Sequence, residues 1–203
     1  MALTIYGSPQ SRTKRTLWAA EELGLAYEHV PLEWSDPALK TAEFLRLNPS
    51  GSIPVIVDDG FALAESLAIN LYLCKRYGSG GATPLYPDDR RREADVWRWS
   101  LWAQAHLEPW VQRDAWAAPI REAAGKSLDT AVRAGLSVLD AALRGRDWLA
   151  DAHFTVADLN VAAVLSPSRA VQLPLADYAG VSAWLARCYD RPAARTVRLR
   201  FPS

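Results

Sequence analysis

The sequence predicts an α/β domain followed by an all-helical domain, and three observations point to this fold class. Strand-like and helix-like segments alternate within residues 1–77. A glycine- and proline-rich segment at residues 78–88 then interrupts the pattern. Beyond it, residues 89–203 carry helical spacing alone. We therefore expect two domains, 1–77 and 89–203, joined by a linker at 78–88.

Composition and charge narrow the class of protein. The 203 residues are 50% hydrophobic and 23% charged, as in a soluble globular protein, and the formal net charge is zero. This balance favours neither nucleic acid nor an anionic membrane as a partner. The start lacks a basic leader pattern, and no apolar run reaches membrane-spanning length. Cys74 and Cys188 form no C-x-x-C motif, so we expect a reducing, cytoplasmic location.

The first half of the α/β domain is predicted to be strand, helix, strand. Leu3–Tyr6 forms a short strand, and a turn-rich loop leads to Ser11, which occupies a helix N-cap position. The helix extends to about Leu23, and Tyr27–Leu32 alternates like an edge strand. A further helix is possible between Pro37 and Arg46.

The stretch from Asn48 to Ser66 organises the rest of this domain. Pro54 opens a strand, Asp59-Gly60 makes a tight turn, and a second strand leads into a helix from Ser66 to Tyr77. If the Ile53–Pro54 bond is cis, the Ile53 backbone turns outward and can hold an extended peptide. The Glu65 carboxylate beside free helix N–H groups suits a zwitterionic ligand. An ordinary hairpin with an edge proline explains the same pattern.

The second domain is predicted to contain long helices. Asp88 or Asp89 caps a tryptophan-rich helix, which Pro109 should kink or break. Thr155 and Asp158 form a capping box that opens a later helix. A basic tail follows and is expected to be a solvated face; its residues are Arg187, Arg191, Arg195, Arg198 and Arg200.

At this point the chain resembles the cytosolic glutathione S-transferases over essentially its whole length. The similarity rests on Tyr6-Gly7-Ser8-Pro9-x-Ser11, Asn48-Pro49-x-Gly51-x-Ile53-Pro54, Glu65-Ser66-x-Ala68-Ile69 and Phe154-Thr155-x-Ala157-Asp158. The resemblance implies a thioredoxin-like N-terminal domain with a mixed four-stranded sheet and an all-α C-terminal helical bundle. It also implies glutathione as co-substrate, no metal, and a homodimer.

The resemblance also assigns a catalytic hydroxyl. Ser11 aligns with the serine of the phi- and theta-type members, which stabilises the glutathione thiolate; the alternative is that Ser11 only caps its helix. Tyr6 is the main rival, because other classes use a tyrosine near the end of the first strand. Ser8 and Thr13 are weaker rivals. No cysteine lies in this loop, which disfavours mixed-disulfide chemistry.

The glutathione and electrophile sites follow in the same way. The expected glutathione contacts are Ser11, Lys40, Ser52, Ile53, Pro54, Glu65 and Ser66, although Lys40 is equally well explained as a solvent-exposed lysine. The expected electrophile pocket is lined by Ser8, Pro9, Trp102, His106 and Trp110, with packing in the domain core as the alternative for each aromatic residue.

Three functions remain open on this scaffold. The first is conjugation of glutathione to small hydrophobic electrophiles, with a possible peroxidase side activity. The second is isomerisation or reductive dehalogenation, and the third is binding of glutathione or a hydrophobic ligand without catalysis. His29, His106 and His153 lack metal-ligand spacing, and the sequence has neither a G-x-S-x-G nor a G-K-[ST] motif, so hydrolase and P-loop readings are disfavoured.

Overall fold

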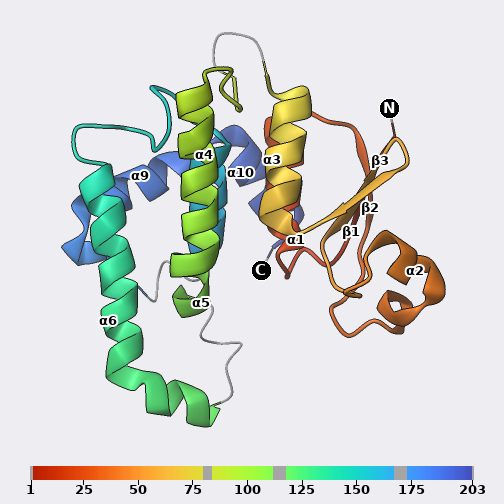
Figure 1. The fold of residues 1–203 in the computed structure, drawn as a ribbon, viewed down its shortest axis with the longest axis horizontal. Helices are drawn as coiled ribbons and strands as arrows, with labels where there is room; N and C mark the ends of the chain where they lie inside the picture. Colours follow the sequence, from red (N-terminus) through yellow and green to blue (C-terminus); the bar gives the residue numbers. More distant parts are fainter. Residues whose placement is uncertain (1, 80–83, 112–117, 167–172, 203) are drawn as a thin grey trace. The chain divides into compact units, whose positions relative to one another are not determined.

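A computed structural model describes residues 2–79, 84–111, 118–166 and 173–202. The chain packs as two units, one comprising residues 1–81 with 191–203 and the other residues 82–190. Both units are drawn in Figure 1, and each is described by itself below. Within the described residues, no helix is long and apolar enough to cross a membrane.

The first unit is built on a mixed four-stranded sheet in the order β2-β1-β3-β4. Its strands are β1 (Leu3–Tyr6), β2 (Tyr27–Val30), β3 (Val55–Asp58) and β4 (Phe61–Ala64). β1 runs parallel to β2 and antiparallel to β3, and β3 pairs antiparallel with β4. This confirms the predicted mixed sheet. β2 ends at Val30, before the proline that cannot donate to a ladder.

Helices cover both faces of this sheet. Figure 1 shows α1 (Thr13–Glu22) and α3 (Ser66–Tyr77) on one side and α2 (Ala42–Leu47) on the other. Alternation in β1 explains the two layers, because Leu3 and Ile5 are buried on one face while Tyr6 joins a cluster with Phe44 of α2 on the other.

The helix expected between Pro37 and Arg46 is divided into two pieces. A 3₁₀ turn, η1 (Pro37–Lys40), is followed by α2, and Thr41 separates them with extended backbone angles. The Thr41 hydroxyl accepts the Phe44 N–H at 3.3 Å, so this residue caps a new helix rather than continuing the first.

The last helix, α10 (Pro192–Arg200), packs on α1 within the first unit. Arg191 donates to both carboxylate oxygens of Glu22 at 2.7 Å, and the Glu22 side chain is only 5% exposed. Arg200 approaches Glu21 at 3.2 Å. Residues 191–203, which lie within the range 89–203 expected for the helical domain, are thus grouped with the first unit. Arg191 is also not part of a solvated face, because it forms this partly buried ion pair.

The second unit is helical in its described residues. Its elements are α4 (Arg90–Trp102), η2 (Ala103–Leu107), α5 (Glu108–Val111), α6 (Ala118–Ala142), α7 (Val156–Leu165), η4 (Leu175–Asp177) and α9 (Ala179–Asp190). α7 is buried at every position and packs against α4 and α9. The helical run continues through Pro109, which was expected to kink or break it, but regular α-helix gives way to a π-helical turn just before this residue: in η2 the Glu108 N–H donates to Ala103 O.

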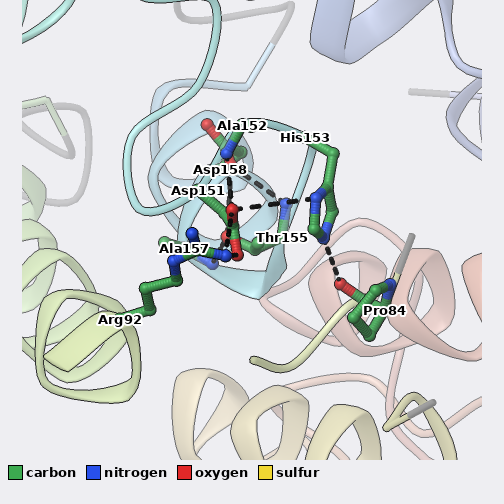
Figure 2. A network of polar contacts seen from close by, with 8 residues as sticks. All are labelled: Pro84, Arg92, Asp151, Ala152, His153, Thr155, Ala157 and Asp158. Atoms are coloured by element: carbon green, nitrogen blue, oxygen red, sulfur yellow. Dashed lines mark hydrogen bonds and ion pairs between the residues drawn. The ribbon is translucent and has the colours of Figure 1, made fainter. Parts of the chain in front are cut away.

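The predicted capping box at the start of α7 is confirmed. The Asp158 carboxylate accepts from the Thr155 N–H at 3.0 Å, and the Thr155 hydroxyl accepts from the Ala157 N–H at 3.3 Å. Figure 2 shows this network beside a second one around Asp151, whose carboxylate meets Arg92 at 2.8 Å. Capping satisfies the N–H groups that a helix start leaves without partners inside the helix.

Asp158 also holds segments beyond its own helix. One carboxylate oxygen accepts from the Leu149 N–H and from the Trp184 indole N–H, each at 2.9 Å. Burial raises the pKa of Asp158, while the hydrogen bonds from Trp184, Thr155 and Leu149 act in the opposite direction. The carboxylate therefore connects the start of α7 to α9 and to the segment before α7.

The two cysteines are expected to be unreactive while the protein is folded. Cys74 on α3 and Cys188 on α9 are both 0% exposed. Burial raises the pKa of the Cys74 thiol, and the nearby charge of Glu22 adds to this effect. Because thiolates are the reactive form, a disulfide reagent at neutral pH should modify neither residue. In denaturant the same titration should count two thiols per chain; fast reaction of the folded protein would contradict the burial.

Candidate functional site

Sheet register brings three predicted site segments to one edge of the first unit. Val55 pairs with Tyr6 on one side and with Ala64 on the other. The residues next to these pairs are therefore neighbours: the loop from Gly7 follows β1, Pro54 precedes β3, and Glu65 follows β4. Loops that leave a rigid sheet at one edge are a common place for binding groups.

The turn before β3 presents backbone groups outside the sheet. The Ile53–Pro54 peptide bond is cis. The ladder begins at Val55, so the Ile53 backbone lies outside the strand pairing. Ile53 packs its side chain against the cluster of Leu39, Phe44 and Val55. Because the Ile53 side chain is anchored and its backbone lies outside the sheet's strand pairing, this residue is suited to bind an extended peptide.

A buried asparagine holds this turn in shape. Asn48 Nδ2 donates to Ser52 O at 2.8 Å, and Asn48 Oδ1 accepts from the Ser50 N–H at 3.2 Å. Lys40 Nζ donates to Gly51 O at 3.0 Å, so the lysine that was predicted to contact glutathione lies beside the turn. Lys40 and Ser52 are both exposed, and each can reach a ligand from the surface.

Glu65 and Ser66 form the start of α3. Glu65 is the N-cap residue, with a backbone φ of 71°. Residues other than glycine rarely adopt this conformation, and those that do cluster at functional sites. Glu65 is exposed, whereas Ser66 is buried and accepts from Arg15 Nη1 at 3.4 Å. The exposed carboxylate at a positive helix end is a natural partner for an ammonium group.

The Ser11 hydroxyl lies in the loop before α1. It accepts from the Thr13 N–H at 3.1 Å and lies 2.9 Å from Thr13 Oγ1. It donates to Ser8 O at 2.6 Å. The helix begins at Thr13 and its N-cap residue is Arg12, so the prediction of Ser11 as the N-cap is wrong by one position. Ser11 nevertheless takes a first-turn N–H, which places its oxygen at the positive end of the helix.

Tyr6, the rival hydroxyl, has a packing role. Its ring meets Phe44 edge-on, with centroids 6.2 Å apart, inside the cluster that includes Leu39 and Val55. This packing favours Ser11 over Tyr6 as the residue that faces a ligand. The assignment of the catalytic hydroxyl stays a prediction.

Gly7 is required for the loop that carries Ser11. Its φ is +132°, and a Cβ at this position would collide with Thr13 Oγ1 and lie 2.9 Å from Ile53 Cβ. Gly7→Ala should therefore cost about 1–3 kcal/mol in the free energy of unfolding. Denaturant titration measures this loss. Gly24→Ala is the control, since it shares a positive φ of +61° but has no neighbour within 4 Å of the added carbon. If both substitutions lowered the free energy of unfolding equally, the collision at Gly7 would not be the cause of the loss.

The predicted electrophile residues belong to both units. Ser8 is buried and donates from its hydroxyl to Gln10 Oε1 at 2.9 Å, while Pro9 is half-buried. Trp102 is half-buried and meets Trp99 edge-on at 5.3 Å, His106 is exposed, and Trp110 is half-buried. The pocket itself stays a prediction. In the described ranges, no cluster of three or more histidine, cysteine or acidic residues could hold a metal ion.

The surroundings of Ser11 hold contacts that sequence reasoning missed. For Arg15 the sequence leaves open an orienting role on the first helix or a surface role; its side chain is 4% exposed and donates to Ser66 Oγ at 3.4 Å. His29 Nε2 lies 2.8 Å from Gly7 O, and Gln10 Nε2 donates to Pro202 O at 3.1 Å. The contacts of His29 and Gln10 bridge 22 and 192 residues, so no local pattern announces them.

The first unit, with its mixed sheet and a cis-proline turn at the sheet edge, places the chain among thioredoxin-like proteins with an added helical domain. Family models for the N-terminal and C-terminal domains of glutathione S-transferases match residues 1–75 and 99–192. The chain therefore belongs to the glutathione S-transferase family.

Individual relatives agree with this assignment. The chain is 32% identical to glutathione S-transferase 3 of Zea mays, over 98% of this chain and 95% of the relative. Among solved structures, glutathione S-transferase III in its apo form is 30% identical with a TM-score of 0.84, covering 100% of this chain and 98% of that one. Ure2p in complex with glutathione shares the fold, with a TM-score of 0.86 at 20% identity and coverage of 97% and 92%.

Proposed function

We propose that this chain is a glutathione transferase that uses the Ser11 hydroxyl to stabilise the glutathione thiolate for attack on small hydrophobic electrophiles. The observation that carries the proposal is the meeting of three segments at one sheet edge: the Ser11 loop, the cis-proline turn and the Glu65-Ser66 helix start. The family membership and the catalysed reaction named for the maize relative support the same activity.

The thiol must lose its proton before it can attack. A free thiol has a pKa of roughly 8.5, so little thiolate exists at neutral pH. Lowering this pKa by roughly two units requires about 2.7 kcal/mol of preference for the anion. One hydrogen bond to the charged sulfur supplies about 1.5–3 kcal/mol, and the helix end adds a few tenths. The Ser11 hydroxyl, at the start of α1, combines both contributions.

The remaining contacts are assigned by the chemistry of the tripeptide. The Ile53 backbone, next to Pro54, holds the cysteinyl residue in the manner of a paired strand. Glu65 and Ser66 receive the γ-glutamyl end, where an ammonium and a carboxylate need opposite partners. Lys40 and Ser52 lie along the turn at the other end and suit the glycyl carboxylate.

One contact favours a second candidate function, which is binding of glutathione or a hydrophobic ligand without catalysis. The Ser11 hydrogen is donated to Ser8 O at 2.6 Å, so it must turn away from that carbonyl before it can serve a thiolate. If the Ser11 hydroxyl does not rotate away from this carbonyl, the protein would bind the tripeptide without activating its sulfur.

Assembly and location follow the family pattern. We propose a homodimer in the cytoplasm, with glutathione and a small electrophile as its partners and peroxide reduction as a side activity. Size-exclusion chromatography with light scattering gives the mass of the assembly directly.

Binding and turnover, measured together, test the proposal. Calorimetry with glutathione and with S-methylglutathione should give heat for both, because the backbone and carboxylate contacts do not involve the thiol. Conjugation to a chlorinated nitroaromatic should occur with glutathione and not with S-methylglutathione, which has no free thiol. Binding without turnover of any electrophile would favour the second candidate, and the absence of binding heat from folded protein would refute both.

A further inference from the structure

The loop that carries Ser11 is tied to the segment that follows α10, Phe201–Pro202. Gln10 Nε2 donates to Pro202 O at 3.1 Å, and Gln10 Oε1 accepts from the Ser8 hydroxyl at 2.9 Å. The Ser8 carbonyl in turn accepts from the Ser11 hydroxyl at 2.6 Å. Hydrogen bonds and one short stretch of backbone therefore lead from Pro202 to the candidate catalytic oxygen.

A second contact ties the other end of the same loop. The Phe201 ring meets His29 edge-on, with ring centroids 5.2 Å apart and an interplanar angle of 80°. His29 Nε2 lies 2.8 Å from Gly7 O. Gly7 and Gln10 flank Ser8 in the sequence, so Phe201–Pro202 reaches the loop on both sides of that residue.

The segment after α10 is itself held firmly. The Phe201 N–H donates to Val197 O at 2.9 Å, which continues the bonding of the helix. Arg200 donates to Glu21 at 3.2 Å, and Arg191 pairs with Glu22 at the opposite end of α10. Both acidic residues belong to α1, the helix that Ser11 precedes. The helix and the loop before it are therefore fastened to the same C-terminal element.

We propose that Gln10 is a positioning residue through which Phe201–Pro202 fixes the Ser8 carbonyl, which accepts from the Ser11 backbone N–H at 3.0 Å, and thereby fixes the place of the Ser11 oxygen. The inference rests on the proposed function, since it assigns a role to a hydroxyl that acts on the glutathione sulfur. Hydrogen-bond strength falls steeply with misalignment, so a loop free to shift by a fraction of an ångström stabilises the thiolate less.

The side-chain chemistry of Gln10 explains why an amide stands there. Its NH₂ group donates to the Pro202 carbonyl, and its oxygen accepts from the Ser8 hydroxyl. A glutamine side chain offers a donor and an acceptor on the same terminal amide. Neither contact involves the residues assigned to the tripeptide. Gln10 is exposed, so its replacement should leave the core of the unit intact.

The test uses Gln10→Met, which keeps the length of the side chain and removes both hydrogen bonds, and Phe201→Ala, which loosens the segment. Leu199→Ala, on the helix that precedes Phe201, is the matched control, because Leu199 is 85% exposed. The readouts are the pH profile of kcat/KM and the ultraviolet titration of the bound thiolate. If the variant weakens the contact between the Ser11 hydroxyl and the thiolate by about the worth of one neutral hydrogen bond, kcat/KM should decrease about threefold to tenfold at pH values below the pKa of the bound thiol.

The pH profile separates positioning from general damage. A weaker hydroxyl contact raises the pKa of the bound thiol, so the deficit should shrink as the pH rises above that pKa. Because the tripeptide contacts are untouched, the KM for glutathione should stay within about twofold of the wild-type value. A deficit that is equal at every pH would overturn the proposal.

A double-mutant cycle asks whether the two residues act together. If Phe201 acts through Gln10, the double variant should lose little more than the single variants, whereas additive losses would refute a shared path. If Phe201→Ala unfolds the protein, Gln10→Met decides alone, and an unchanged thiolate titration in it would sink the proposal. Ser11→Ala keeps the outcomes apart: no effect there refutes the proposed hydroxyl itself, whereas a loss there with none in Gln10→Met refutes only the positioning role.

Discussion

Ser11→Ala is expected to lower kcat/KM for conjugation by about tenfold to a hundredfold at pH 6.5, because a hydrogen bond to a charged sulfur is worth about 1.5–3 kcal/mol. The substitution leaves the Thr13 N–H without its acceptor and removes the hydroxyl from the start of α1. The contacts proposed for the tripeptide at the cis-proline turn and Glu65 do not involve Ser11, so glutathione should still bind. The loss should therefore appear mainly in kcat.

The sign of the pH dependence follows from the same contact. Under the proposed function, wild-type protein is expected to hold the pKa of the bound thiol below its usual value of roughly 8.5, and the variant should return it toward that value by about one to two units. Below both pKa values the thiolate fraction falls, and above both the two proteins hold equal fractions. The difference should thus be largest under mildly acidic conditions and should fade in alkali.

The matched control is Ser79→Ala, an exposed serine whose hydroxyl donates to Lys75 O at 2.7 Å. It makes the same chemical change away from the site and should leave both kcat and the thiolate titration unaltered. An unchanged rate in Ser11→Ala would move the role to another hydroxyl. Tyr6→Phe, Ser8→Ala and Thr13→Val would then identify which of the three predicted rivals carries it.

Asp158→Ala is expected to destabilise the protein by about 3–5 kcal/mol, since it leaves several buried donors without an acceptor. These donors are the N–H groups of Leu149 and Thr155, the Thr155 hydroxyl and the Trp184 indole. For a chain of this size such a loss lowers the Tm by about 10 °C. Thermal unfolding followed by circular dichroism measures it.

Two further variants make this prediction specific. Asp158→Asn retains one acceptor oxygen but turns an NH₂ group toward other donors, so it should recover only part of the loss. Asp177→Ala removes an acidic residue whose side chain is 62% exposed in its pair with Arg133, and should cost at most about 1 kcal/mol. If Asp158→Ala and Asp177→Ala proved equally mild, the carboxylate would not connect α7 to its neighbours in the way described.

Local sequence signals predicted much of the fold. The Asp59-Gly60 turn has positive φ at both residues, as the tight turn between β3 and β4 requires. Thr155 and Asp158 stand three residues apart, so their reciprocal bonds could be expected from spacing alone. The π-helical turn falls where Pro109 withholds a backbone N–H.

Contacts between distant residues could not be predicted in this way. Nothing in the spacing of the arginines after α9 indicates that Arg191 pairs with Glu22, 169 residues away, or that α10 packs on α1. The division at Thr41 depends on a choice between two helical bonding patterns that differ little in energy. At the candidate site, residue types suggested Ser11, whereas its partners Ser8 and Gln10 became evident from the folded loop.

The burial of both cysteine thiols gives this protein a practical use. A thiol introduced by Leu199→Cys would stand on an exposed position of α10, while Cys74 and Cys188 stay shielded. A fluorophore attached there would report, in the otherwise native chain, how the neighbouring Phe201–Pro202 segment behaves as the tripeptide arrives and departs.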